Sequence, residues 1–221
     1  MSPEILAMIG WSTLDTLWMV AVSGVLGAAI GVPLGVFLAT SNRGELFAAP
    51  AANRALGLIV NATRSTPFII LVVAIIPFTR LVAGTSIGTR AAIVPLTIAA
   101  APFIARIIEA AIREVDQGLI EAARAFGATP LQIVRKVLLL EALPAVTLGL
   151  TLTLVSLIGY SAMVGAVGGG GLGDLGIRYG YQRFMPDVML VVVLVLIVLV
   201  QGVQTIGDNL ARRLDKRTRR G

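Results

Sequence analysis

The feature that most constrains this fold is a set of long apolar segments. A hydrocarbon core of about 30 Å needs about 20 helical residues to cross it. Five segments reach that length, at residues 14–40, 55–82, 90–112, 137–167 and 186–207. The last contains the run VMLVVVLVLIVLV, which has no polar side chain and suits a surface facing lipid. The sequence therefore predicts an all-α polytopic membrane protein with five transmembrane helices, forming a single transmembrane domain over residues 1–221.

Composition agrees with that prediction and narrows the chemistry. The chain is 57% hydrophobic and 14% charged, with a mean hydropathy of +0.91, whereas soluble domains carry about 25% charged residues. It has no cysteine and no histidine, which excludes disulfides, thiolate or imidazole metal ligands and the commonest general base. We therefore expect no catalytic residues and no metal site in this chain.

The basic residues indicate topology rather than nucleic-acid binding, because they fall between and after the apolar segments. The cytoplasmic side of a membrane protein carries the excess of Lys and Arg. Twelve lie on one predicted side, namely Arg43, Arg54, Arg113, Arg124, Arg135, Lys136, Arg212, Arg213, Lys216, Arg217, Arg219 and Arg220, against four on the other, Arg80, Arg90, Arg178 and Arg183. This asymmetry predicts a cytoplasmic C-terminus and, with five spans, an N-terminus outside.

The first apolar segment carries glycines at a repeated spacing of four. Gly27, Gly31 and Gly35 fall on one helical face, where small residues let a second helix approach closely. The pattern favours packing within the chain, and the alternative is a contact between two copies.

The connection at residues 113–136 is predicted to form two short helices joined by a tight turn. Asp116 is a good N-cap, and Gly127 stands where a helix would end in a left-handed residue. Thr129, Pro130 and Gln132 have the pattern of a capping box that starts the next helix.

This loop resembles the EAA loop of binding-protein-dependent ABC importer permeases. Glu121, Ala122 and Ala123 are followed after three residues by Gly127. The resemblance implies that the loop is cytoplasmic and forms the coupling helix that docks on an ATPase subunit, with Glu121, Ala122, Ala123, Phe126 and Gly127 as the docking residues. The chain has no G-x-x-x-x-G-K-[ST] phosphate loop, so we expect ATP to bind a separate partner and no cofactor to bind this chain.

The glycine-rich stretch from Ser161 to Phe184 contains matches to G-x-G-x-x-G. A dinucleotide site would also need a strand and a soluble βαβ unit, so we interpret these glycines as turns at the membrane face. The stretch, together with Arg64–Phe68 and the run GATPLQIVRKVLL, is similar to methionine ABC transporter permeases. That resemblance implies a complex of two permeases, two ATPases and an external methionine-binding lipoprotein in the bacterial cytoplasmic (inner) membrane, surrounded by lipid.

Four further residues are candidates for a role in transport. Met163 lies among small residues in the fourth segment and could either gate a narrow path or fill a gap in the core. Arg64, Arg106 and Glu109 are charges within or beside apolar segments and need partners or water. Arg106 and Glu109 are three residues apart and can pair on one helical face. The sequence assigns no residue to substrate binding.

Three alternatives to methionine import remain. Another amino acid or related small solute is the first. An integral-membrane enzyme acting on lipid is the second, and it would need clustered acids or a nucleophile system that the scattered acids here do not suggest. An autonomous channel or secondary transporter is the third, and it would leave the docking loop unexplained.

Overall fold

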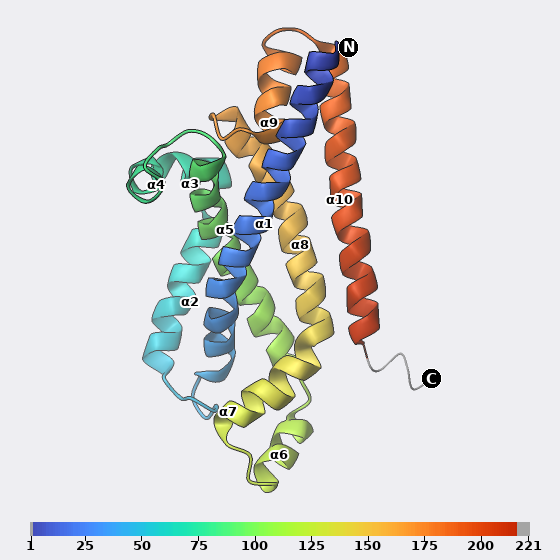
Figure 1. Cartoon of the computed structure of the whole chain (residues 1–221). Helices are drawn as coiled ribbons and strands as arrows, with labels where there is room; N and C mark the ends of the chain where they lie inside the picture. The colour runs from blue at the N-terminus through green and yellow to red at the C-terminus, as the bar shows by residue number, and fades with distance from the viewer. Residues whose placement is uncertain (1, 216–221) are drawn as a thin grey trace.

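The computed structural model describes residues 2–215, and every regular element in that range is a helix (Figure 1), which confirms the all-α prediction. The basic residues Lys216, Arg217, Arg219 and Arg220 lie outside the described residues. The elements, with η for a π-helix, are α1 (Pro3–Thr40), α2 (Pro50–Ser65), α3 (Phe68–Ala74), α4 (Ile76–Ala83), α5 (Thr89–Arg113), α6 (Gln117–Ala125), α7 (Pro130–Ile133), η1 (Val134–Leu138), α8 (Leu139–Ala166), α9 (Gly171–Leu175), η2 (Gly176–Tyr181) and α10 (Pro186–Leu214).

Four helices in the described range are long and apolar enough to cross a membrane: α1, α5, the continuous helix Pro130–Ala166 and α10. A fifth span exists if the bent pair α2 and α3 is counted as one. The predicted number of five therefore depends on this pair.

Helix α1 begins eleven residues before the predicted start of the first span, at Pro3 instead of residue 14. The Ser2 hydroxyl accepts a hydrogen bond from the Ile5 amide, Pro3 occupies the first turn, and Glu4 lies at the positive end of the helix. These start signals are polar, so hydropathy alone places the start of the helix too late. At 38 residues α1 is about 57 Å long, well beyond the hydrocarbon thickness.

The glycine spacing of α1 serves contact with α5 within the same chain. A Cβ atom on Gly31 would lie 2.5 Å from the Ala101 carbonyl oxygen, and one on Gly35 would lie 2.4 Å from that of Ala105. The two backbones are thus too close for any side chain. Of the two interpretations of this spacing, the structure shows packing within the chain.

The predicted second span, residues 55–82, is not one helix. Helix α2 ends at Ser65, and α3 begins at Phe68 after a bend of 105°. Pro67 has no amide hydrogen, and it holds Thr66 in an extended conformation that ends the preceding helix. A second break follows at Ile75, after which Pro77 stands in the first turn of α4. The segment predicted as the second span is thus divided into three helices, and Figure 1 shows α4 projecting sideways from the bundle.

The glycine tract turns the chain back from α8 into α9, as predicted. Gly168, Gly170 and Gly171 all have positive φ angles, which favour glycine. The Gly88 amide donates a 2.8 Å hydrogen bond to the Gly168 carbonyl. The buried Leu172 amide donates to the Thr16 hydroxyl at 2.9 Å and so ties α9 to α1.

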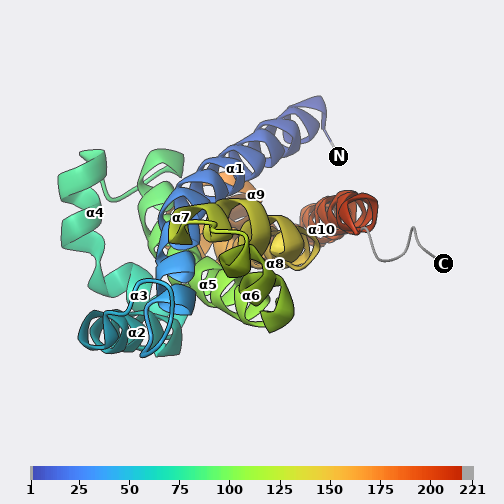
Figure 2. The ribbon, with the colours of Figure 1, turned by 90° about the horizontal axis from the view of Figure 1, so that it is seen from below.

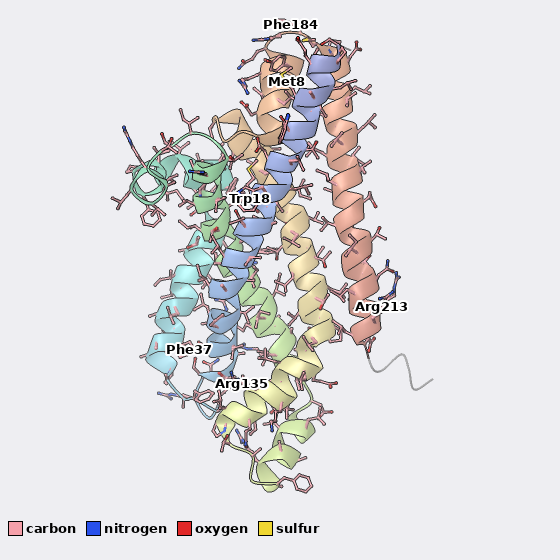
Figure 3. The ribbon with its side chains drawn as sticks, in the orientation of Figure 1. Met8, Trp18, Phe37, Arg135, Phe184 and Arg213 are labelled. Carbon is pink, nitrogen blue, oxygen red and sulfur yellow. The ribbon has the colours of Figure 1, made fainter. Side chains whose placement is uncertain are left out.

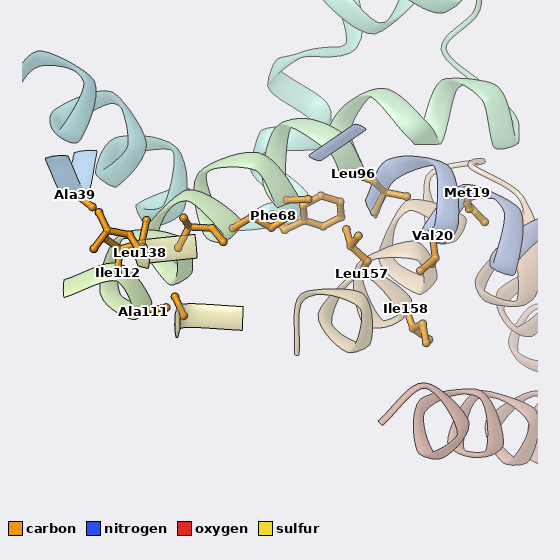
Figure 4. Close-up of a cluster of buried hydrophobic side chains, with 14 of the residues drawn as sticks. Met19, Val20, Ala39, Phe68, Leu96, Ala111, Ile112, Leu138, Leu157 and Ile158 are labelled. Carbon is orange, nitrogen blue, oxygen red and sulfur yellow. The ribbon is translucent and has the colours of Figure 1, made fainter. Parts of the chain in front are cut away.

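Helix α10 lies at one side of the bundle against α8 (Figures 1 and 2). Only 6% of the residues in its most apolar 18-residue stretch are buried, so its outer face suits lipid. The main core lies between α1, α5 and α8, with Phe68 of α3 packed into it (Figure 4). A smaller apolar cluster joins the first turns of α1 to α9 and α10.

Candidate functional site

The loop between α5 and α8 forms a small hairpin of helices at one end of the molecule (Figure 1). Helix α6 begins at the predicted cap, where an Asp116 carboxylate oxygen accepts a 2.6 Å hydrogen bond from the Gly118 amide. It ends at Ala125, and Gly127 in the turn that follows has a φ of +76° and donates its amide to the Arg124 carbonyl at 2.9 Å. The left-handed turn predicted at this glycine is confirmed.

The turn is closed on its other side by the predicted capping box. The Thr129 hydroxyl accepts from the Gln132 amide, and the Gln132 side-chain oxygen accepts from the Thr129 amide at 2.9 Å. These bonds fix the direction in which α7 leaves the turn. Because α7, η1 and α8 are continuous, a force on the hairpin would act directly on a long span.

The hairpin presents one face to the bundle and leaves the other open. Ile120 and Ala123 are half-buried and pack against the main core. Glu121, Ala122 and Gly127 are exposed, and the Phe126 side chain is 91% exposed. Leu119 and Leu131 are exposed as well. Uncovered apolar side chains next to charged ones are typical of a surface that binds another protein.

Two of the intramembrane charges form the predicted pair. Arg106 contacts a Glu109 carboxylate oxygen, and the other oxygen of Glu109 lies 2.8 Å from Arg113. Arg106 also donates to the Gly57 carbonyl at 3.0 Å and to the Asn61 side-chain oxygen at 2.9 Å. The network joins α5 to α2, an arrangement that serves structure rather than an exposed binding surface.

Replacing Glu109 with glutamine is expected to destabilise the protein. Its side chain is only 8% exposed, and without it Arg106 and Arg113 would lose their shared anion, at a cost of about 2 to 3 kcal/mol. The unfolding midpoint of the purified protein in detergent should fall for Glu109→Gln and stay near wild type for Glu114→Gln, a matched change at an exposed carboxylate. Equal midpoints for both variants would contradict a structural role for the network.

Arg64 lies apart from this network. Its guanidinium faces the Phe103 ring at 5.7 Å from the centroid, and within residues 2–215 it forms no ion pair. It is exposed and stands in the last turn of α2, just before the break at Pro67. The structure therefore separates Arg64 from Arg106 and Glu109, which the sequence groups together as charges in apolar segments.

Met163 lies in the last turn of α8 and is 38% exposed. The neighbouring Ser161 is buried and donates to the Ile158 carbonyl. Met163 is therefore not part of the buried core cluster, and part of its side chain reaches the surface of this chain.

The sequence analysis did not identify the cavity between the loop that joins α1 to α2 and helix α6. A cavity of about 200 Å³ lies there, lined in part by Glu45, Arg113, Gln117 and Arg124. Burial raises the pKa of the Glu45 carboxyl above its ordinary value of 4.5, an effect that Arg113 partly offsets and Glu109 reinforces. Only tertiary packing brings these residues together, so no local signal pointed to them.

Comparison with known proteins finds a matching family and similar sequences. Residues 31–220 match the family described as "Binding-protein-dependent transport system inner membrane component". The "Probable D-methionine transport system permease protein MetI" of Vibrio cholerae is 59% identical over 206 residues, which cover 93% of this chain and 92% of that one. The Escherichia coli "D-methionine transport system permease protein MetI" is 58% identical over 151 residues, covering 68% of this chain and 70% of that one.

Solved structures agree with the sequence comparison. A chain of "Inward facing conformations of the MetNI methionine ABC transporter" is 51% identical, with a TM-score of 0.96, over 98% of this chain and 100% of that one. A chain of "an amino acid ABC transporter with histidines" is 19% identical with a TM-score of 0.77, covering 96% of this chain and 100% of that one. This second likeness concerns the fold alone.

Proposed function

This chain belongs to the family of binding-protein-dependent transport system inner membrane components, and on that premise we propose that it is the membrane-spanning subunit of an ATP-driven methionine importer. The observation that carries the transport role is the exposed face of the α6–α7 hairpin, with Phe126 and Glu121 uncovered at one end of a bundle of apolar helices. The substrate assignment rests on the relatives, whose names specify methionine transport.

We propose that the hairpin couples this chain to a separate ATPase. Phe126 and the small exposed residues Ala122 and Gly127 would enter a cleft of the partner, and Glu121 would make a charged contact at its edge. Ala123, which was expected among the docking residues, packs against the main core instead and would hold the helix in place. ATP would bind the partner and no cofactor would bind this chain. This division of labour makes the chain a transport subunit and not an enzyme.

The assembly would hold two copies of this chain, two ATPases and an external substrate-binding lipoprotein in the bacterial inner membrane. The described residues 2–215 of one copy hold four or five spans, too few to enclose a path for a solute, so a symmetric pair is the physical expectation. Residues 1–221 would act as one transmembrane domain within it.

The orientation that we propose places the hairpin and the C-terminus in the cytoplasm and the N-terminus outside. Among the described residues, Arg43, Arg113, Arg124, Arg135 and Lys136 belong to the segments around the hairpin. Arg80 belongs to α4, Arg90 to the start of α5, Arg178 to η2 and Arg183 to the turn before α10. Helices α4 and α9 lie toward the other end (Figure 1). The excess of positive charge thus lies at the hairpin end.

Transport would proceed by alternating access. When ATP closes the two partner subunits, the hairpins would move with them and carry α8 along. Met163, exposed at the far end of α8, would meet its counterpart on the second copy and close the outer end of the path when the inner end is open. Its flexible thioether could yield when the path opens outward.

Uptake of labelled L-methionine at submicromolar concentration tests the proposed function. Cells that lack this gene should regain ATP-dependent uptake when they express the chain, and unlabelled D-methionine should be tested as a competitor because the relatives are named for it. Uptake of another amino acid with no methionine uptake would keep the importer and overturn the substrate. Restored uptake without the ATPase gene would instead favour an autonomous channel or secondary transporter.

A further inference from the structure

A partly open cavity of about 140 Å³ lies where α2, α3, α5 and α8 meet, beside the break at Pro67. It is separate from the hairpin and from the Arg106–Glu109 pair. Its lining includes one cationic group, four aliphatic hydroxyl groups and three aromatic rings, one of them a phenol, provided by Arg64, Thr63, Thr66, Thr153, Ser156, Phe68, Phe103 and Tyr160. The space suits an occupant of amino-acid size and excludes an oligosaccharide.

A charged side chain at the depth of this cavity raises the free energy of the protein unless water or a partner solvates it. Arg64 is such a side chain. Fourteen residues separate Arg64 from the first residue of α2, a rise of about 21 Å. In the proposed orientation α2 starts at the cytoplasmic face, so this rise would carry the guanidinium into the hydrocarbon core of about 30 Å. Charges at such depths face a cavity or a partner and mark substrate paths. Within residues 2–215 the guanidinium has an aromatic neighbour but no carboxylate.

The four aliphatic hydroxyl groups of the lining present acceptors, because each donates its own proton to a backbone carbonyl. Thr63 donates to the Ile59 carbonyl, Thr66 to Ala62, Thr153 to Gly149 and Ser156 to Leu152, each to the carbonyl four residues back. A hydroxyl oxygen that has donated its proton keeps lone pairs for a second partner. These oxygens can therefore accept hydrogen bonds from an ammonium group.

The aromatic residues supply an apolar surface on another side. The Phe68 and Tyr160 rings are stacked at 4.4 Å between centroids, and Phe103 lies beneath Arg64. Sulfur atoms and aromatic rings make favourable contacts. A cation, hydroxyl acceptors and an aromatic surface together complement the carboxylate, the ammonium and the side chain of a free apolar amino acid.

We propose that this cavity is a transient binding site for the transported amino acid within the membrane, and that Arg64 binds its carboxylate. The inference rests on the proposed import function and adds to it the residues that meet the solute. The site would hold an apolar zwitterion such as methionine on its way between the external binding protein and the cytoplasm.

Photo-crosslinking in the assembled transporter tests this site. Photo-methionine carries a diazirine on its side chain and keeps both the amino and the carboxyl group. In the reconstituted complex with its ATPase and binding protein, mass spectrometry should locate the label on α5 near Phe103 or on α8 near Tyr160. Arg64→Gln should lower both labelling and methionine uptake at least about tenfold, the loss expected for one charge-assisted contact. Labelling only at residues outside the cavity would overturn the proposal.

Two further variants separate substrate binding from a structural role. Arg54→Gln changes an exposed arginine on the same helix, outside the cavity, and should leave labelling and uptake near wild type. Phe103→Leu removes the ring under the guanidinium but keeps the charge, and should retain at least about a third of the uptake. Equal losses for Arg64→Gln and Phe103→Leu, or co-purification of an anionic lipid that depends on Arg64, would overturn the substrate role. If the wild-type transporter imported no methionine, that result would refute the proposed function instead.

Discussion

Replacing Phe126 with alanine is expected to release the partner ATPase, although the ring makes little contact within its own chain. The side chain is 91% exposed on the turn that ends α6. An exposed aromatic ring at the centre of an interface commonly contributes about 2 kcal/mol or more to binding, so the affinity should fall at least about thirtyfold. The retention of the ATPase on the affinity-purified permease, and ATP-dependent methionine uptake, should both fall with it.

A matched control exists at the other end of the molecule. Phe184 is 86% exposed at the end opposite the hairpin (Figure 3), and Phe184→Ala should leave the amount of retained ATPase unchanged. Glu121→Lys should reduce ATPase retention as Phe126→Ala does, because it reverses a charge on the same exposed face. If Phe126→Ala and Phe184→Ala retained equal amounts of ATPase, the docking surface would have to lie elsewhere.

Replacing Gly35 with leucine is expected to abolish the folded protein. A Cβ atom at this position would lie 2.4 Å from the Ala105 carbonyl oxygen and 2.6 Å from the Ile108 Cβ. The first of these atoms is backbone and the second is the branched Cβ of isoleucine, so α1 and α5 would have to separate along their most extensive contact. Overpacking by a single group costs about 1 to 3 kcal/mol, and a full leucine side chain should exceed that. The amount of protein in the membrane should fall at least about fivefold.

Gly10→Leu provides the control for this prediction. Gly10 lies on the same helix, but a Cβ atom there meets no atom within 4 Å. The level and the unfolding midpoint of Gly10→Leu should therefore match wild type. Because both substitutions add the same side chain to α1, a difference between them reports the close contact at Gly35. Normal levels of Gly35→Leu would mean that α1 and α5 do not pack as closely as the structure has them.

Local sequence signals predicted the hairpin well. The Asp116 cap, the left-handed Gly127 and the Thr129–Gln132 capping box each depend on residues within a few positions of one another. Long apolar runs likewise identify α5 and α10, because any helix of that length and hydropathy needs a membrane or a large core. These features follow from short-range chemistry alone.

The remaining features depend on tertiary packing or on polar signals. Pro67 ends α2 instead of kinking it, and a proline in an apolar segment is compatible with either result. Hydropathy missed the first turns of α1 because Ser2, Pro3 and Glu4 start the helix with polar groups. The cavity at Arg64 draws its lining from four helices, so only the folded chain brings Phe68, Phe103 and Tyr160 to that arginine.

The most direct test of the central claim is methionine accumulation in proteoliposomes. The purified permease and ATPase would be reconstituted together, with ATP enclosed and the binding protein and labelled methionine added outside. The proposed function predicts accumulation above the external concentration that requires enclosed ATP and is lost with Phe126→Ala. Equal accumulation without ATP, or with Phe126→Ala in vesicles that contain matched amounts of both subunits, would contradict an importer coupled through the α6–α7 hairpin.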